Sequence, residues 1–142
     1  MAEKDLTKEE WARVEKAMSG RYGIAKLKVD GRDVTFSREM TSKNRLGVVI
    51  YVDGKWEMKW VGVENEEIPE QRYLCPHEKF VYGAKHRSEL KKISKKRRTE
   101  WGWGDPDRKG KIFYPYATSL TPIRRHYQKT FASIELVEVT GA

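Results

Sequence analysis

The residues best suited to chemistry in this sequence are cations that gather in one short run. Between Lys85 and Arg98 the segment KHRSELKKISKKRR holds eight Lys or Arg side chains against one Glu. Residues 1–84 carry 15 basic and 15 acidic side chains, and residues 99–142 carry six and five, so the net charge of +8 lies almost entirely in this run. A local excess of cations favours an anionic partner, and phosphate backbones bound by Lys and Arg release counterions.

Two tryptophans follow directly, in the Gly-rich segment WGWGDPDRKG of residues 101–110. Trp101 and Trp103 stand beside cations, a pairing typical of single-strand binding, since bases stack on aromatic rings at about 1–3 kcal/mol each. The alternative is that both rings are buried and anchor the loop, because most Trp side chains are largely buried. The sequence leaves these two alternatives open.

Smaller groups of cations occur elsewhere in the chain. Arg124 and Arg125 lie with His126 and Lys129 in one such group, and Arg38, Lys43 and Arg45 form another. We predict a nucleic-acid-binding surface composed of Lys91, Lys92, Lys95, Lys96, Arg97, Arg98, Trp101, Trp103, Arg124 and Arg125. Because phosphate contacts position a protein without reading bases, we expect little base specificity. DNA and RNA are not distinguished.

No motif for catalysis, metal binding or cofactor binding is present. The Cys and His residues have a spacing that matches no familiar zinc site; they are Cys75, His77, His86 and His126. A nucleophile and base drawn from Cys75 and a histidine lacks local sequence that would position them. Asp105-Pro106-Asp107 is typical of a turn, and no Gly-rich phosphate loop occurs. We therefore expect a protein without enzymatic activity, metal or cofactor.

The elements that position these residues can be predicted from caps, alternation and turns. A capping box at Thr7-Lys8-Glu9-Glu10 predicts a helix that ends at Ser19-Gly20. Two hairpins are predicted around Asp30-Gly31 and Asp53-Gly54, because apolar residues alternate on both sides of each turn. The second hairpin would place Trp56, Met58 and Trp60 on a buried face, and residues 41–47 would join the two hairpins.

The later segments are predicted to be mostly helical. Pro76 suits the first turn of a helix that would continue to Ile93 and carry much of the basic run, with Leu90 and Ile93 held against the body. The whole basic run would span about 20 Å if helical. A short helical or irregular piece is expected over residues 70–74, an extended piece over 111–116, a helix over 119–131 and a final strand over 134–139.

The totals indicate one α+β domain over residues 1–142. Its expected parts are an N-terminal helix, an antiparallel sheet of about five strands made of a hairpin meander plus a C-terminal strand, and two further helices packed mainly on one face. A single cysteine excludes an internal disulfide. No stretch approaches the roughly 18 apolar residues of a membrane span, and we expect a cytoplasmic protein without membrane contact.

Three segments, GVVIYVDGKWEMKW, KISKKRR and SIELVEV, resemble small basic proteins of unknown function carried by tailed phages and prophages. The resemblance covers most of the chain and includes no catalytic motif. It implies a cytoplasmic setting and either handling of nucleic acid or interference with host machinery. The basic run has two other interpretations: a solvated, charged helix end, or the docking surface of a small inhibitor or adaptor that binds an acidic surface of a host protein.

Overall fold

The computed structural model describes residues 4–141 and has an α+β fold, which confirms the predicted class. The elements are α1 (Lys8–Ser19), β1 (Ile24–Val29), β2 (Arg32–Ser42), β3 (Arg45–Val52), η1 (Met58–Trp60), β4 (Gly62–Val63), η2 (Pro69–Tyr73), β5 (Cys75–Phe80), α2 (Ala84–Lys91), α3 (Lys95–Glu100), β6 (Lys109–Tyr114), β7 (Tyr116–Ala117), α4 (Leu120–Thr130) and β8 (Ile134–Thr140). The strands form a five-stranded sheet in the order β7-β3-β2-β1-β8 and a three-stranded sheet in the order β4-β6-β5.

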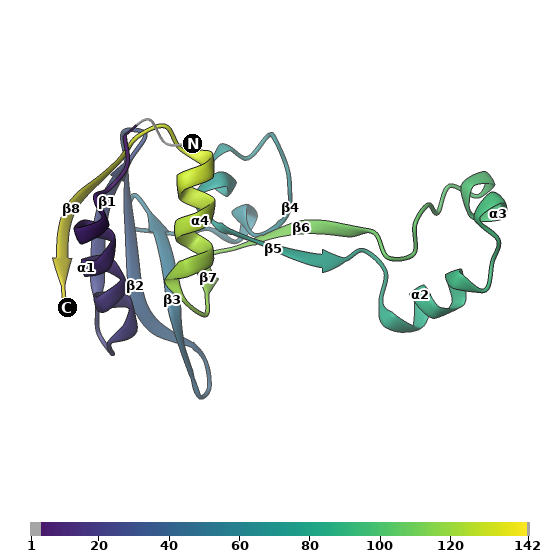
Figure 1. The fold of residues 1–142 in the computed structure, drawn as a ribbon, viewed down its shortest axis with the longest axis horizontal. Coiled ribbons are helices and arrows are strands. Elements are labelled where there is room, and N and C mark those ends of the chain that lie inside the picture. The colour runs from purple at the N-terminus through teal and green to yellow at the C-terminus, as the bar shows by residue number, and fades with distance from the viewer. Residues whose placement is uncertain (1–3, 142) are drawn as a thin grey trace.

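The five-stranded sheet forms a body whose one face is covered by α1 and α4 (Figure 1). The helix α1 contacts β1, β2 and β8, while α4 contacts β7 and β5. The core lies between these helices and the sheet, where Trp11 and Val14 of α1 meet alternate residues of the strands. Phe36 of β2 pairs with Ala25 on one side and Ile50 on the other, and all three are fully buried.

The local signals at the start of the chain are confirmed. Thr7 and Glu10 form both hydrogen bonds of the capping box, so α1 begins where the sequence predicts. Asp30 and Gly31 both have positive φ angles, of 47° and 84°, in the turn between β1 and β2. A two-residue turn of this kind matches the twist of the flanking strands. The predicted helix over 119–131 and the final strand also occur, as α4 and β8.

The predicted strand over Trp56–Trp60 is wrong. Only an isolated bridge joins Val52 to Lys55, and the chain then enters η1 with Met58 exposed and Trp60 alone buried. The position beside β3 is taken by β7, where Val48 pairs with Ala117. The predicted joining loop over residues 41–47 is mostly strand, because β2 and β3 pair directly up to Ser42 and Arg45.

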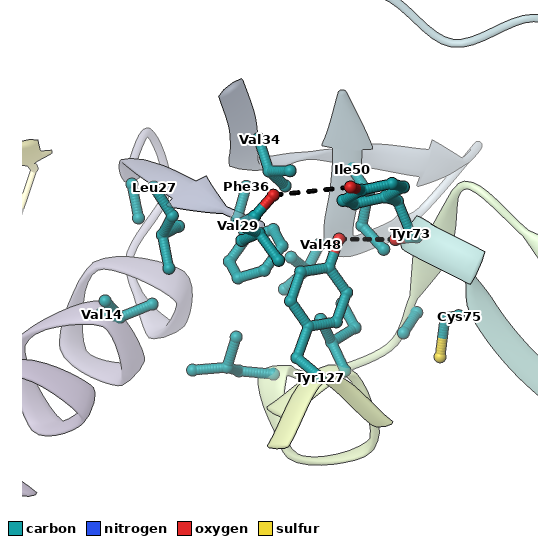
Figure 2. Packing of buried hydrophobic residues seen from close by; sticks show 14 of the residues in the cluster. Val14, Leu27, Val29, Val34, Phe36, Val48, Ile50, Tyr73, Cys75 and Tyr127 are labelled. Atoms are coloured by element: carbon teal, nitrogen blue, oxygen red, sulfur yellow. Dashed lines mark hydrogen bonds between the residues drawn. The ribbon is translucent and has the colours of Figure 1, made fainter. Parts of the chain in front are cut away.

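Two buried tyrosines connect α4 to the rest of the core (Figure 2). The Tyr127 hydroxyl donates a hydrogen bond of 2.5 Å to the carbonyl oxygen of Tyr73, whose own hydroxyl lies 3.4 Å from the carbonyl oxygen of Val29. The Tyr73 ring stacks on Phe131 with centroids 4.6 Å apart. Burial raises the pKa of Tyr127 well above its usual range, so this hydroxyl stays protonated as a donor.

No helix within residues 4–141 combines the length and the apolar character that crossing a membrane would require.

The bond between Tyr127 and Tyr73 supports a prediction about stability. Tyr127→Phe should lower the free energy of unfolding by about 1–3 kcal/mol, because it leaves the buried Tyr73 carbonyl without its donor. Urea denaturation measures the change. Exposed Tyr22→Phe is the matched control and should leave the denaturation midpoint unchanged. Equal midpoints for the two variants would contradict the assigned role of the Tyr127 hydroxyl.

Candidate nucleic-acid interface

A two-stranded arm carries the basic run away from the body. The strands β5 and β6 pair from Cys75 opposite Tyr114 to Phe80 opposite Lys109, and they leave the sheet as a ribbon (Figure 1). Cys75 and Phe113 are buried at the inner end, whereas Phe80 is exposed at the outer end. Residues 81–108, here called the arm tip, lie beyond this ribbon and contain α2 and α3.

The helix predicted from Pro76 to Ile93 is wrong in its first half. Pro76 lies in β5, which is an edge strand, and an edge position tolerates a residue that cannot donate a ladder hydrogen bond. Helix α2 begins only after Gly83 and ends at Lys91. Ser94 then caps a new helix, α3, by accepting a hydrogen bond from the backbone of Arg97. The basic run is therefore divided between two short helices.

The arm tip has a small hydrophobic centre of its own. Leu90 is fully buried and Pro106 is also buried, yet Leu90 lies outside the core cluster of the body. The prediction that Leu90 holds a helix against the body is therefore wrong. The Arg87 guanidinium lies 3.6 Å from the ring centroid of Phe80, and Asp107 pairs with Lys91 at 3.2 Å and with Arg87 at 3.7 Å. These contacts fold the tip back on the end of the ribbon.

Most of the predicted phosphate-contacting cations are free of ion pairs. Among residues 4–141, no carboxylate lies within 4.0 Å of the side-chain nitrogens of Lys92, Lys95, Lys96, Arg97 or Arg98. Lys91 differs from them because it pairs with Asp107. Lys92, Lys95, Lys96 and Arg97 are exposed, so the surface of the tip is strongly cationic.

One of these cations is partly enclosed. Arg98 is half-buried, and its Nε–H is buried and has no hydrogen-bond partner among residues 4–141. It lines a hollow of about 360 Å³ together with Lys95, Thr99, Gly104 and Asp105. The Nε atom itself is closed to solvent, so an anion in this hollow would meet the outer part of the Arg98 guanidinium and the Lys95 ammonium, with the Asp105 carboxylate opposing it.

Both tryptophans of the tip are exposed, so the alternative that they are buried is wrong. Trp101 has 53% and Trp103 has 38% of its surface accessible to solvent. Their rings meet edge to face with centroids 5.8 Å apart, and His86 meets Trp103 at the same distance. The Tyr82 hydroxyl donates a hydrogen bond of 2.6 Å to the Trp103 carbonyl oxygen. The result is an exposed aromatic surface beside the unpaired cations.

The structure does not bring the remaining predicted residues to this surface. Arg124 and Arg125 lie on α4 in the body, at a distance from the arm tip (Figure 1). The Arg124 guanidinium lies 5.1 Å from the ring centroid of Trp11 and helps to join α4 to α1. Arg38 also belongs to the body, where Nη1 is 3.4 Å from the carbonyl oxygen of Thr118. The cations therefore form separate groups rather than one broad face.

Sequence reasoning missed several residues that the fold adds to the tip and its ribbon. Arg108 lies over the ring of Tyr82 at 5.7 Å, and Lys109 lies over Phe80 at 5.1 Å. Arg108 and Lys109 lie in the same Gly-rich segment as the two tryptophans, so the sequence alone could have indicated that they belong to this surface. The aromatic residues Tyr82 and His86 carried no such signal, because only the folding of α2 against the Trp loop brings them together.

Cys75 and His126 both lie in structural surroundings. Cys75 is buried, and burial raises the pKa of its thiol to about 11. The Nε2 atom of His126 lies 2.6 Å from the carbonyl oxygen of Arg72, and burial lowers the pKa of this imidazole. Within residues 4–141, no three His, Cys, Asp or Glu side chains are grouped to hold a metal ion.

Comparison with known proteins finds no family model, no curated protein and no solved structure that matches this chain.

The separate centre of the arm tip leads to a testable prediction. Leu90→Ala should speed amide hydrogen exchange in residues 81–108 while leaving the unfolding midpoint of the body nearly unchanged, because Leu90 contributes nothing to the main core. Ile123→Ala removes a buried side chain of the body and should lower global stability by about 2–5 kcal/mol. A global loss as large for Leu90→Ala as for Ile123→Ala would show that the two centres are not separate.

Proposed function

We propose that the protein is a non-enzymatic nucleic-acid-binding protein that uses its arm tip and prefers single strands. The observation that carries the proposal is the presence, on one projecting surface, of unpaired cations beside two exposed tryptophans. Cations alone would suit any polyanion, and exposed aromatic rings alone would suit many partners. The combination of the two is what single-stranded nucleic acid requires, since phosphates need charge and unstacked bases need rings.

Phosphate contacts would come from Lys92, Lys95, Lys96, Arg97 and Arg98. No carboxylate of residues 4–141 pairs with them, so each is available to displace a counterion from the nucleic acid. Lys91 is expected to contribute less, because Asp107 already neutralises it. The hollow beside Arg98 offers a partly enclosed contact, where the outer guanidinium nitrogens can donate to a phosphate oxygen.

Base contacts would come from Trp101 and Trp103. A ring can stack on any base, so these contacts add affinity without reading sequence. The positive φ angles of Gly102 and Gly104, 75° and 65°, give the loop a path that other residues rarely adopt. Because these rings can stack on any base, little base specificity is expected.

The first prediction concerns the unpaired cations. Replacing Lys92, Lys95, Lys96 and Arg97 together by Gln should weaken binding to a labelled single-stranded oligonucleotide. The slope of log affinity against log salt should fall by about 0.7 for each lost contact, and thus by as much as about 3 in total. Fluorescence anisotropy across a salt series measures both quantities.

The matched control removes four cations of the body. Lys8, Arg13, Lys16 and Arg21 are exposed and have no carboxylate partner within residues 4–141, so changing them to Gln alters the net charge equally. This control should retain most of the affinity and of the salt slope. The same loss in both variants would mean that only net charge matters. Unchanged binding by the tip variant would refute the proposal and leave an acidic protein surface as the partner to be tested.

The second prediction concerns the exposed rings. Trp101→Ala should lower affinity for single strands by about 1–3 kcal/mol, or roughly 5- to 150-fold, because it removes one stacking surface. Affinity for a duplex of the same length should change less than about twofold, since paired bases do not present their faces. The control is Trp56→Ala, which removes a comparably exposed ring from the body. Equal losses on single and double strands would contradict the stacking role.

A further inference from the structure

The face of the sheet opposite the two helices carries a cavity at the base of the arm. Val49 and Tyr51 point to this face, since they alternate along β3 with the buried Val48, Ile50 and Val52. The cavity has a volume of about 430 Å³, within the range of ligand-binding sites. Its walls are mainly aromatic and apolar, and the residues that matter most here are Glu39, Tyr51, Trp56, Met58, Tyr114 and Tyr116.

Several apolar side chains that line this cavity are exposed to solvent. Met58 has 73% of its surface accessible to solvent, and Met40, Trp56 and Tyr116 are exposed as well. These exposed apolar side chains lie together on the wall of one cavity, which is the usual composition of a small-molecule site. Trp56 and Met58 are the residues whose alternation predicted a buried strand, and the fold presents them at the cavity wall instead.

The charge of the cavity decides what kind of ligand it suits. Glu39 is its only charged lining residue, in a chain with a net charge of +8. One Glu39 oxygen accepts a hydrogen bond of 2.7 Å from the Tyr51 hydroxyl, and the other accepts none within residues 4–141. Desolvation and the adjacent carboxylate raise the pKa of Tyr51 to about 12, so the phenol stays neutral and does not add a second negative charge.

These features favour a ligand of the opposite charge to the one proposed for the arm tip. No Lys or Arg lines the cavity, and a carboxylate would repel a phosphate. The faces of aromatic rings attract cations, above all those that are weakly hydrated. The chain itself provides an example at the edge of the site, where the Lys79 ammonium lies 4.9 Å from the Tyr114 centroid and 2.9 Å from its hydroxyl.

We propose that this aromatic cavity binds an alkylated ammonium group. The rings of Tyr51, Trp56 and Tyr116 would surround the cation, and Glu39 would supply the opposite charge. A quaternary ammonium suits this site better than a primary one, because its methyl groups also bury apolar surface against Met58. The inference is independent of nucleic-acid binding, since it concerns a different surface with the opposite charge.

The test compares choline with its neutral isostere, in which a tert-butyl group replaces the trimethylammonium group. Both are titrated into the full-length protein while the indole Nε1–H resonances are followed by NMR. Choline should shift the Trp56 resonance and bind about tenfold more tightly than the isostere, since the two differ only in charge. Equal affinity, or no binding of choline, would overturn the proposal.

Two variants and one control locate the binding. Trp56→Leu and Glu39→Gln should each weaken choline binding by about five- to tenfold, because they remove a cation-binding face and the opposite charge. Trp103→Leu, at the arm tip, should leave choline binding unchanged. Circular dichroism confirms that each variant is folded, and oligonucleotide binding by the Trp56 and Glu39 variants should be unaltered. Unchanged choline binding in both cavity variants would overturn the assignment.

A further titration identifies the source of the ammonium group. The N-acetyl amide of trimethyllysine is titrated beside free choline and beside the same derivative of unmethylated lysine. Tighter binding of trimethyllysine than of choline would assign a methylated protein side chain, and the reverse would assign a small choline-like molecule. Preference for unmethylated lysine over trimethyllysine would contradict the requirement for an alkylated cation.

Discussion

Every feature of the arm depends on the pairing of β5 with β6. An isolated two-stranded ribbon is only marginally stable in water, so this one must be held at its ends. At the inner end Cys75 and Phe113 are buried in the core, and β4 adds a third strand where Gly62 pairs with Phe113. At the outer end the guanidinium of Arg87 lies against Phe80. Because side chains alternate along a strand, a shift of β6 by one residue would move Phe113 out of the core. The same shift would place every side chain of β6 on the opposite face of the ribbon, including those that contact the tip.

The elements that the sequence predicts well are those set by local chemistry. The capping box at Thr7 starts α1 by satisfying backbone donors, and the pair Asp30-Gly31 adopts the positive φ angles that its turn requires. The composition of the arm tip is equally local, so its cations and tryptophans could be named in advance. Their separation from Arg124 and Arg125 could not be, since it depends on which strands pair over long distances.

The wrong predictions have a common cause in competition between local and distant partners. Alternation over residues 55–60 favours a strand, but β7 occupies the edge of β3, and Gly47 allows its close approach because a Cβ there would lie 2.7 Å from the Ala117 carbonyl oxygen. Alternation also cannot tell a buried face from a cavity wall, which is where Trp56 and Met58 lie. Pro76 fits both the first turn of a helix and an edge strand, and pairing with β6 decides for the strand.

The arm separates the cations of the tip from the acidic residues of the body, so that among residues 4–141 only the tip's own carboxylates lie near them. Glu70, at the end of the acidic connector over residues 64–70, lies 3.7 Å from Arg32 of the body. The six-residue strands of the ribbon separate the two regions by about 20 Å at roughly 3.3 Å per residue. That exceeds the screening length of about 8 Å at physiological ionic strength, so body carboxylates neutralise the tip only weakly. If the same cations lay on the body, carboxylates could fold against them and compete with an anionic ligand. Distance therefore keeps the cations of the tip available to a ligand. Deleting two residues from β5 and the two that pair with them in β6 would bring the tip closer to the carboxylates of the body without changing the composition of the tip.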